Sequence, residues 1–417
     1  MKILEFSPVP LSPALNDSGV HGPVIGGWVE SLIRAMLKES ADIQFCVISL
    51  GTHSSDISVG GVRYLTADVK MFVGIARKVI NEFRPDVIHI NGAEFFYAAF
   101  PIDVYGNVPV VVSLQGIING YMPHYNGALT PIELRGTNIN LRYLLRGTSI
   151  LGEQKKWYKE QSKAEATAIS QHRYFTGRTD WDRAWVQYIN PTAKYFSVNE
   201  TLRAPFYKAM RTPQTVVRHS IYCGAAAGYP LKGLHWLVRA VASLKTEFPD
   251  IQLRVAAAKD RIGARRGFVA QLKDDAYAIY LRRLIRQLGV QDNIIGLPSL
   301  SAEAVVKELE HAEIFVLPSL CENSPNSLGE AMLVGTPAIA TYVGGTPSIL
   351  KDRDEGMLVP SADPAILACA IRHWFNHPDE AETCAKKAQI KARMRHDGSA
   401  NAKAMLAVYK EVLNENI

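Results

Sequence analysis

The chain has 417 residues, which is enough for two domains that each bury a core of their own. Apolar residues make up 47% and charged residues 21%, the proportions of an ordinary globular protein, and a net charge of +6 is too small to indicate a nucleic-acid partner. The five cysteines are scattered without a CxxC pair, which argues against a disulfide framework or a zinc site and predicts reduced thiols in the cytoplasm.

The first half of the chain alternates short apolar runs with amphipathic stretches. Residues 1–8 predict a buried strand rather than a signal peptide, and no apolar run reaches the roughly 18 residues of a membrane-spanning helix. Gly26 and Gly27 then open an amphipathic helix, where two glycines allow either close approach of a phosphate or tight helix packing. His89, inside an apolar run, is typical of a core histidine. Further strand segments are predicted at 45–50, 87–90, 110–114, 169, 174–176 and 194–198.

One long stretch, residues 117–163, departs from this alternation. It is rich in Tyr, Asn, Arg and Leu, and from Arg135 to Arg183 ten Lys and Arg stand against five Asp and Glu. A flap that binds an acceptor or a membrane surface is one interpretation. A solvated insertion is the other, because charge runs often mark only a wet face.

The sequence Asp180-Trp181-Asp182 is a DxD pattern of the kind that holds a divalent metal in another architecture of sugar-transferring enzymes. Here it follows a predicted strand and precedes a predicted helix. Capping of that helix by Thr179 or Asp180 is the better interpretation. We therefore predict no catalytic metal and no cofactor.

The alternation restarts after a Pro-containing, basic boundary at 208–215. Strand–helix alternation in both halves predicts two doubly wound α/β domains, with the ligand in the cleft between them. The GxGxxG fingerprint is absent, which counts against a dehydrogenase. The elements predicted in this half are strands at 220–224, 253–257, 294–295, 314–317, 338–341 and 357–359, and helices at about 234–245 and 400–414.

The most informative segment is Cys321-Glu322-Asn323-Ser324-Pro325-Asn326-Ser327-Leu328-Gly329-Glu330-Ala331-Met332. It follows an apolar run and predicts a strand, a loop and a helix, with Glu322 in the loop and Glu330 about two turns into the helix. Open α/β sheets bind ligands at the carboxyl ends of their strands, and the first N–H groups of a helix suit a phosphate. One carboxylate can therefore meet a hydroxyl-rich group on one side of a diphosphate, and the other a group beyond it.

This segment resembles the E-x7-E signature of the retaining GT-B glycosyltransferases of family 4, a group that includes sucrose and glycogen synthases. The continuation Gly335-Thr336-Pro337 and Gly344-Gly345-Thr346-Pro347 is also similar to that family. The resemblance implies two Rossmann-like domains that face each other across a cleft. Their predicted bounds are 1–210 for the acceptor domain, with a C-terminal helix at about 400–417 crossing back onto it, and 216–398 for the nucleotide-sugar domain.

The resemblance also assigns roles. It implies that Glu322 contacts the donor sugar and stabilises the positive charge that develops at the anomeric carbon. Glu330 would accept hydrogen bonds from the ribose, and Lys232, which follows a Gly/Ala-rich loop, would assist departure of the diphosphate. Further donor-binding candidates are Gly26, Gly27 and the amides of Asn326, Ser327 and Leu328.

The chain departs from the family at several positions. Ala226 and Ala227 stand where relatives carry an arginine, and the replacement stays open among Arg261, Arg265 and Arg266. In the first domain, Asn91 and Gln115 stand at strand ends where histidine is common. These two residues, together with His21 in the first loop, are the candidates on the acceptor side or for contact with the sugar.

The resulting hypothesis is a retaining, metal-independent hexosyltransferase-type glycosyltransferase (EC 2.4). A nucleotide-diphosphate sugar, with UDP as the expected carrier, would be the donor, and a saccharide or lipid-linked saccharide of a surface polysaccharide would be the acceptor. The expected location is the cytoplasm, with peripheral association at the inner face of the membrane as an open alternative. Two other functions are left open: a nucleotide-sugar epimerase or hydrolase on the same fold, and a catalytically weak nucleotide-sugar-binding partner protein.

Overall fold

The computed structural model describes residues 1–11, 27–137, 145–224, 227–263 and 274–416. The chain forms two compact units. The first unit comprises Met1–Asn119, Glu160–Arg203 and Met394–Ile417, and the second comprises Gly120–Lys159 and Ala204–Arg393. Within the described ranges, no helix is both long enough and apolar enough to cross a membrane.

The first unit is built on an eight-stranded sheet in the order β3-β4-β2-β1-β5-β6-β7-β8. Neighbouring strands are parallel except for β3 and β4, which are antiparallel. The central strands are buried along their whole length, as expected for a parallel sheet that is covered on both faces. The strands are β1 (Lys2–Ser7), β2 (Gln44–Leu50), β3 (Ser55–Val59), β4 (Val62–Ala67), β5 (Val87–Asn91), β6 (Val110–Ser113), β7 (Tyr174–Gly177) and β8 (Lys194–Ser197).

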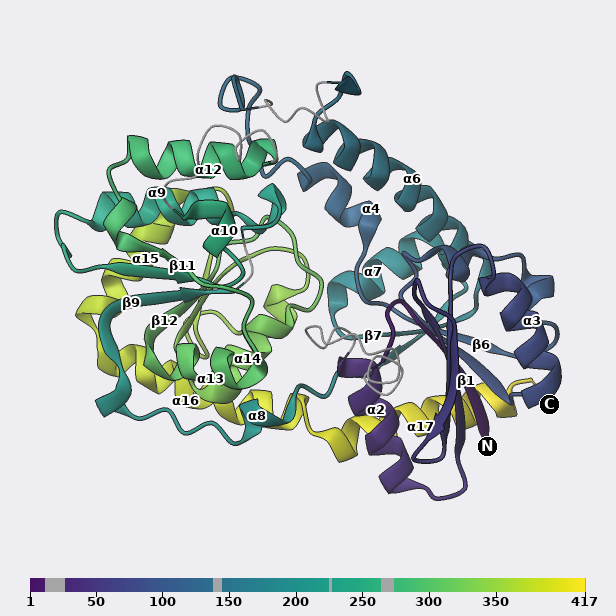
Figure 1. Cartoon of the computed structure of the whole chain (residues 1–417). Helices are drawn as coiled ribbons and strands as arrows, with labels where there is room; N and C mark the ends of the chain where they lie inside the picture. Colours follow the sequence, from purple (N-terminus) through teal and green to yellow (C-terminus); the bar gives the residue numbers. More distant parts are fainter. Residues whose placement is uncertain (12–26, 138–144, 225–226, 264–273, 417) are drawn as a thin grey trace. The chain divides into compact units, whose positions relative to one another are not determined.

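Helices cover both faces of this sheet, and the C-terminal helix α17 lies beside α2 (Figure 1). Tyr409 and Met405 of α17 are buried in one cluster with Ile33 and Met36 of α2. The predicted return of the C-terminal helix to the first unit is therefore confirmed. The helices that lie wholly or partly in this unit are α2 (Gly27–Glu39), α3 (Phe72–Phe83), α4 (Ile118–Tyr121), α6 (Ile150–Gln171), α7 (Asp180–Ile189) and α17 (Gly398–Asn414), with short 3-10 turns η1 (Phe96–Ala99) and η2 (Ile102–Val104).

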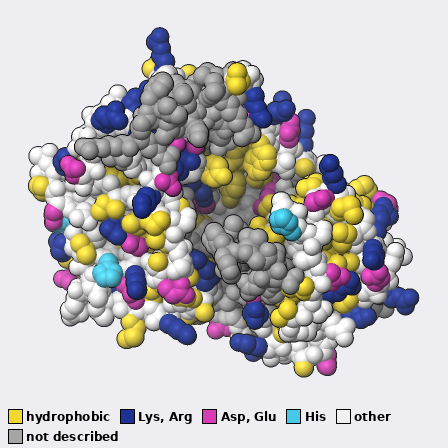
Figure 2. Space-filling model, in the orientation of Figure 1, with side chains coloured by type: hydrophobic (Ala, Val, Ile, Leu, Met, Phe, Trp, Pro, Cys, Tyr) yellow, Lys and Arg dark blue, Asp and Glu magenta, His cyan; other side chains and the backbone are white. Residues whose placement is uncertain are grey.

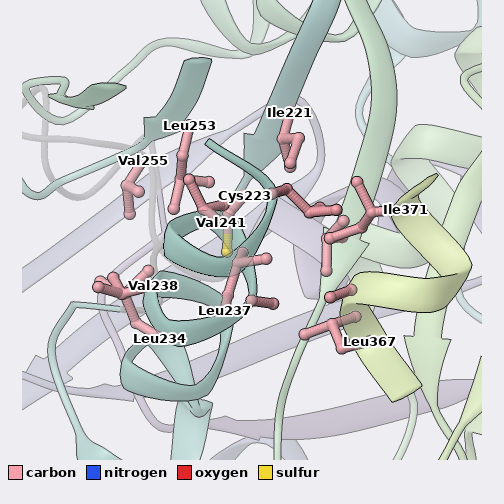
Figure 3. Packing of buried hydrophobic residues seen from close by; sticks show 14 of the residues in the cluster. Ile221, Cys223, Leu234, Leu237, Val238, Val241, Leu253, Val255, Leu367 and Ile371 are labelled. Carbon is pink, nitrogen blue, oxygen red and sulfur yellow. The ribbon is translucent and has the colours of Figure 1, made fainter. Parts of the chain in front are cut away.

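The second unit is built on a six-stranded parallel sheet in the order β11-β10-β9-β12-β13-β14. Figure 3 shows side chains of α9, among them Leu237 and Val241, gathered with Leu253 and Val255 of β10 in one buried cluster. The α9 positions recur at helical spacing, so one apolar stripe faces the sheet. The strands are β9 (Val217–Cys223), β10 (Gln252–Val255), β11 (Ile294–Gly296), β12 (Ala312–Leu317), β13 (Ala338–Thr341) and β14 (Met357–Val359).

The helices of the second unit lie between its strands in the chain, except for α8, which precedes β9, and α15 and α16, which follow β14. They are α8 (Ala204–Tyr207), α9 (Leu234–Leu244), α10 (Lys259–Ile262), α12 (Ala276–Gln287), α13 (Ala302–His311), α14 (Asn326–Val334), α15 (Pro364–Asn376) and α16 (Pro378–Arg395). The 3-10 turns are η3 (Met122–His124), η4 (Pro213–Thr215), η5 (Pro230–Lys232), η6 (Gln291–Asn293) and η7 (Thr346–Ser348).

The predicted fold class, two Rossmann-like α/β units with parallel sheets, is confirmed, and local details differ from the prediction. Ile169 lies in α6 rather than in a strand, because its alanine-rich surroundings favour a helix with one buried face. The strands β3 and β4 were not predicted, since β3 is a largely exposed edge strand. Their signal was Gly60-Gly61, both with positive φ, in the hairpin turn.

Helix α7 begins with the predicted cap. Thr179 caps α7: its side chain accepts from the amide of Asp182, whose carboxylate accepts from the amide of Thr179. The DxD pattern is thus part of a capping box.

Residues 120–159 of the long insertion belong to the compact second unit, whereas the predicted boundary placed them with the first domain.

Candidate functional site

The loop between β12 and α14 carries Glu322 at the carboxyl edge of the second sheet, as the strand–loop–helix pattern predicted. The side chain of Glu322 is almost completely buried, at 7% exposure, and its Oε1 lies 2.6 Å from Nζ of Lys232. The hydroxyl of Ser319 donates to the same carboxylate oxygen at 2.7 Å. The two residues predicted to carry the chemistry are therefore in direct contact.

Two glycines hold this pair in place. Gly233, directly after Lys232, has φ 69°, and a Cβ there would collide with the carbonyl oxygen of Pro318. Gly344 has φ 49°, and a Cβ there would collide with the carbonyl oxygen of Glu322, which also accepts from the amide of Gly345. Only glycine combines this conformation with such close packing. The glycines of the Gly-Thr-Pro continuation thus position the backbone of Glu322.

The thiol of Cys321, next to Glu322, has low reactivity. Cys321 is buried, and burial, together with the charge of Glu322, raises the pKa of its thiol to about 12. A thiol with so high a pKa stays protonated at neutral pH and is a poor nucleophile. Cys321 is therefore a poor candidate for a nucleophile, and the charged pair of Lys232 and Glu322 remains the candidate for the chemistry.

Helix α14 begins at Asn326, with the end of β9 beside its first turn. A Cβ at Gly224 would lie 3.6 Å from Cβ of Ser327, so these two backbones are close. Of the three amides predicted to meet a phosphate, that of Leu328 donates to the carbonyl of Pro325 at 3.0 Å. This amide is thus already engaged inside the turn. Glu330, only 8% exposed, is the fifth residue of α14 and lies just over one turn into it rather than two.

Arg261 is one of the three candidates for the arginine that the family resemblance places at Ala226 or Ala227. Nε of Arg261 donates to the carbonyl of Ala227 at 2.7 Å, and the Arg261 guanidinium also pairs with Asp275 at 2.7 Å. Arg261 therefore lies against the loop in which relatives carry their arginine, with its charge compensated by Asp275. Ala226, Arg265 and Arg266 lie outside the described residues.

Part of the 120–159 segment packs beside the same loop. The hydroxyl of Tyr121 accepts from the amide of Asn323 at 3.1 Å, and Sγ of Cys321 donates to the carbonyl of Gly120 at 3.7 Å. Burial, followed by the charges of Tyr229, Cys321 and Glu322, raises the pKa of Tyr158 to about 12. The segment thus supplies aromatic side chains to the neighbourhood of Glu322, a contribution that its composition did not reveal.

In the first unit, the polar candidates gather at the carboxyl ends of β5 and β6. Asn91 and Gln115 line one small cavity, although Asn91 directs its amide nitrogen inward to Glu5 at 2.8 Å. His89 is a satisfied core histidine, with Nδ1 2.9 Å from Glu5 and Nε2 2.6 Å from the hydroxyl of Ser113. Gly27 is the first residue of α2, whereas His21 and Gly26 lie outside the described residues.

The cavity also contains residues that the sequence interpretation missed. Arg178 directly follows β7, much as Asn91 ends β5 and Gln115 lies two residues beyond β6. It is 6% exposed and paired with Glu200. Its guanidinium donates to the carbonyl of Leu114 at 3.1 Å and to the carbonyl of Gln115 at 3.3 Å. A polar residue directly after a buried parallel strand was the signal that could have identified Arg178.

Parts of the chain are similar in sequence to known proteins. Residues 219–391 match the family model described as "Glycosyl transferases group 1". The chain is 31% identical over 150 residues to a D-inositol 3-phosphate glycosyltransferase of Streptomyces coelicolor, covering 36% of this chain and 31% of that protein. It is 28% identical over 198 residues to an MMP alpha-(1->4)-mannosyltransferase of Mycolicibacterium hassiacum, covering 47% and 44%. The chain thus spans less than half the length of these relatives.

Solved structures share the whole fold at low identity. A sucrose-phosphate synthase of Thermosynechococcus elongatus superposes with a TM-score of 0.74 at 16% identity, over 100% of both chains. Anabaena HepE in complex with UDP has a TM-score of 0.66 at 15% identity, over 99% of this chain and 100% of that one. The chain has the GT-B fold, and its residues 219–391, which include both Lys232 and Glu322, match the group 1 glycosyl transferases.

Proposed function

We propose that the protein is a retaining, metal-independent glycosyltransferase that moves a sugar from a nucleotide-diphosphate sugar to a hydroxyl group of a saccharide or lipid-linked saccharide acceptor. The observation that carries the proposal is the Lys232–Glu322 pair at the carboxyl edge of the second sheet, 2.6 Å apart and within the matched region. UDP is the proposed carrier. It is supported by the fold likeness to a protein whose structures contain UDP and UDP-glucose.

In this proposal the bond between the anomeric carbon and the diphosphate oxygen breaks while the acceptor oxygen forms its bond on the same face of the sugar. The acceptor proton passes to an oxygen of the departing diphosphate. Lys232 compensates the negative charge that grows on the diphosphate, and Glu322 stabilises the positive charge on the sugar ring. Ser319, by donating to Glu322, would keep the carboxylate oriented while Lys232 turns to the diphosphate.

The donor side would extend along α14. The amides of Asn326 and Ser327, in the first turn of a nine-residue helix, are proposed to bind the distal phosphate, and Glu330 to accept from the ribose hydroxyls. The amide of Leu328 would stay in its turn. Gly26 and Gly27 remain proposed donor-binding residues.

The test is release of nucleotide from a panel of UDP-, GDP- and ADP-sugars, with and without EDTA. We expect release from one donor class, unaffected by EDTA, and a loss of at least about a hundredfold in Glu322→Gln. Glu308→Gln is the matched control, because Glu308 pairs with Arg254 and lies in α13 beside Val217 and Ala312, the first residues of β9 and β12, at the opposite edge of the sheet. Release that needs a metal and ignores Glu322 would contradict the proposal. Turnover of the donor that no saccharide acceptor accelerates would favour the epimerase or hydrolase, and binding without turnover the partner protein.

We also propose a cytoplasmic location with peripheral binding at the inner membrane face, in the synthesis of a surface polysaccharide. The five free cysteines, four of them buried, support a reducing compartment. The strongly exposed Ile132 and Leu145 and the half-exposed Trp157 of the 120–159 segment support membrane contact. On the face in Figure 2, however, basic side chains are interspersed with acidic ones. Sedimentation with anionic vesicles tests the idea, and an Ile132→Ser/Leu145→Ser variant that sediments as well as the wild type would contradict it.

A further inference from the structure

The cavity in the first unit lies where several elements of that unit converge. It is lined from the ends of β5, β6 and β7, from the first turn of α2 and from the segment that follows β8, and its volume is about 30 Å³. In an open α/β sheet this carboxyl edge is where ligands bind, and β1 and β5 are the neighbours at which the strand order reverses. The cavity is therefore at the position in the fold where a ligand is expected.

Apart from Arg178 and Glu200, which form an ion pair with each other, three residues at this cavity carry a buried polar atom that makes no hydrogen bond: Nε1 of Trp28, Oδ1 of Asn199 and Oγ1 of Thr201. Buried polar groups in proteins are nearly always paired, because leaving them unpaired is costly. Three such atoms on one cavity indicate that a polar group fills it.

The unpaired atoms specify which kind of group fits. An indole N–H only donates, a side-chain carbonyl only accepts, and a threonine hydroxyl does either. A hydroxyl group, which both accepts and donates, complements all three. The charges nearby balance each other, because Arg178 is paired with Glu200, so a neutral group fits better than an ion.

The cavity is small and preformed. A volume of about 30 Å³ accommodates a water molecule or one hydroxyl-bearing arm, but not a sugar ring. Glu200, between Asn199 and Thr201, is held at two points. Nδ1 of His396 lies 2.7 Å from its carbonyl oxygen, and Arg178 pairs with its side chain.

We propose that this cavity is a specificity subsite that receives a hydroxymethyl arm of a sugar substrate, with Trp28, Asn199 and Thr201 as its specificity-determining residues. The inference rests on the proposed function, which supplies the sugar. The arm belongs to the acceptor sugar or to the donor sugar, and the experiment distinguishes the two sources.

The test follows the indole N–H of Trp28 by NMR in the full chain labelled with 15N-tryptophan. The chain has six tryptophans, and the resonance missing from Trp28→Phe identifies Trp28. The probes are sugars with the hydroxymethyl group and their counterparts without it: methyl glycosides and UDP-sugars of glucose with xylose, galactose with arabinose, and mannose with lyxose. We expect at least one hexose, and not its pentose, to move the Trp28 resonance. Movement by a methyl glycoside assigns the arm to the acceptor, and movement by UDP-sugars alone assigns it to the donor.

The buried indole of Trp374, in the core of the second unit, is the internal control and should stay unmoved. Once a transferred substrate is known, Trp28→Phe and Thr201→Val should each lower the hexose-to-pentose ratio of kcat/KM by roughly tenfold, whereas Trp185→Phe, away from the cavity, should leave it unchanged. A Trp28 resonance that no sugar moves would overturn the inference and assign the cavity to water alone. Because the resonance reports binding, this failure is distinct from an absence of nucleotide release, which would contradict the proposed function.

Discussion

Lys232 and Glu322 are 90 positions apart in the chain, yet Nζ of one lies 2.6 Å from Oε1 of the other. The contact joins the turn after β9 to the loop after β12, and these two strands are hydrogen-bonded neighbours in the sheet. The parallel sheet therefore brings both residues to one edge. Two glycines pressed against carbonyl oxygens, Gly233 and Gly344, allow their backbones to come this close.

Replacement of the lysine should separate its electrostatic role from its packing. We expect Lys232→Met to lower kcat for nucleotide release by roughly a hundredfold or more, because the departing diphosphate loses its compensating charge. Lys232→Arg should recover part of the activity. Lys307→Met, which removes an exposed lysine of the same unit, is the control. Equal turnover by Lys232→Met and wild type would remove Lys232 from the mechanism.

Gly344→Ala should damage both stability and activity, because the new Cβ would push on the carbonyl of Glu322. We expect a loss of about 2 kcal/mol in the free energy of unfolding, measured with urea, together with reduced turnover. Gly60→Ala is a matched control, because Gly60 also has positive φ, at 59°, but nothing lies within 4 Å of its Cβ position. A similar loss in both variants would mean that backbone conformation, and not the contact with Glu322, is responsible.

Cys321 should resist alkylation in the folded protein. Burial raises the pKa of its thiol to about 12, so the reactive thiolate is scarce at pH 8, whereas Cys369 is exposed. We expect iodoacetamide to label Cys369 and to leave Cys321 and the activity intact, as measured by peptide mass spectrometry. Labelling of Cys321 as fast as that of Cys369 would show that the loop after β12 opens readily.

The second unit should lose stability on mild acidification. Burial lowers the pKa of His235 to about 4, from an ordinary value near 6.5, and its ring nitrogens lie 3.0 Å from the carbonyl of Gly127 and 3.0 Å from the hydroxyl of Tyr277. A lowered histidine pKa means that the unfolded chain binds more protons between these values. Stability is therefore complete above about pH 6.5 and falls as the pH drops towards 4.

This one group should contribute a loss of about 2 kcal/mol at pH 5 relative to pH 7. His235→Gln should show a correspondingly smaller difference between the two pH values in urea unfolding, whereas replacement of the exposed His53 should not. His396, whose pKa burial also lowers to about 4, adds a similar dependence to every variant except its own. An unchanged pH dependence in His235→Gln would contradict the assignment.

The local sequence determined a large part of this protein. Short apolar runs between amphipathic stretches indicated two parallel sheets, because buried parallel strands and one-sided helices have different periodicities. Glu322 in a loop between a strand and a helix, and a helix cap at Thr179 or Asp180, were predicted for the same reason: each depends on residues only a few positions away. The length of the helix before Glu330 was misjudged by about one turn, since helix starts are weakly encoded.

Only the tertiary structure decided which distant residues meet. The packing of Tyr121 beside Asn323, the position of Arg261 against Ala227 and the convergence of Trp28, Asn199 and Thr201 on one cavity all join segments without a common local pattern. The order of the strands in the sheets and the paths of the loops determine these contacts, and neither can be inferred from the spacing of apolar residues along the chain. Local chemistry thus determined the elements and the Glu322 loop, whereas the composition of each site depended on how the sheets bring strand ends together.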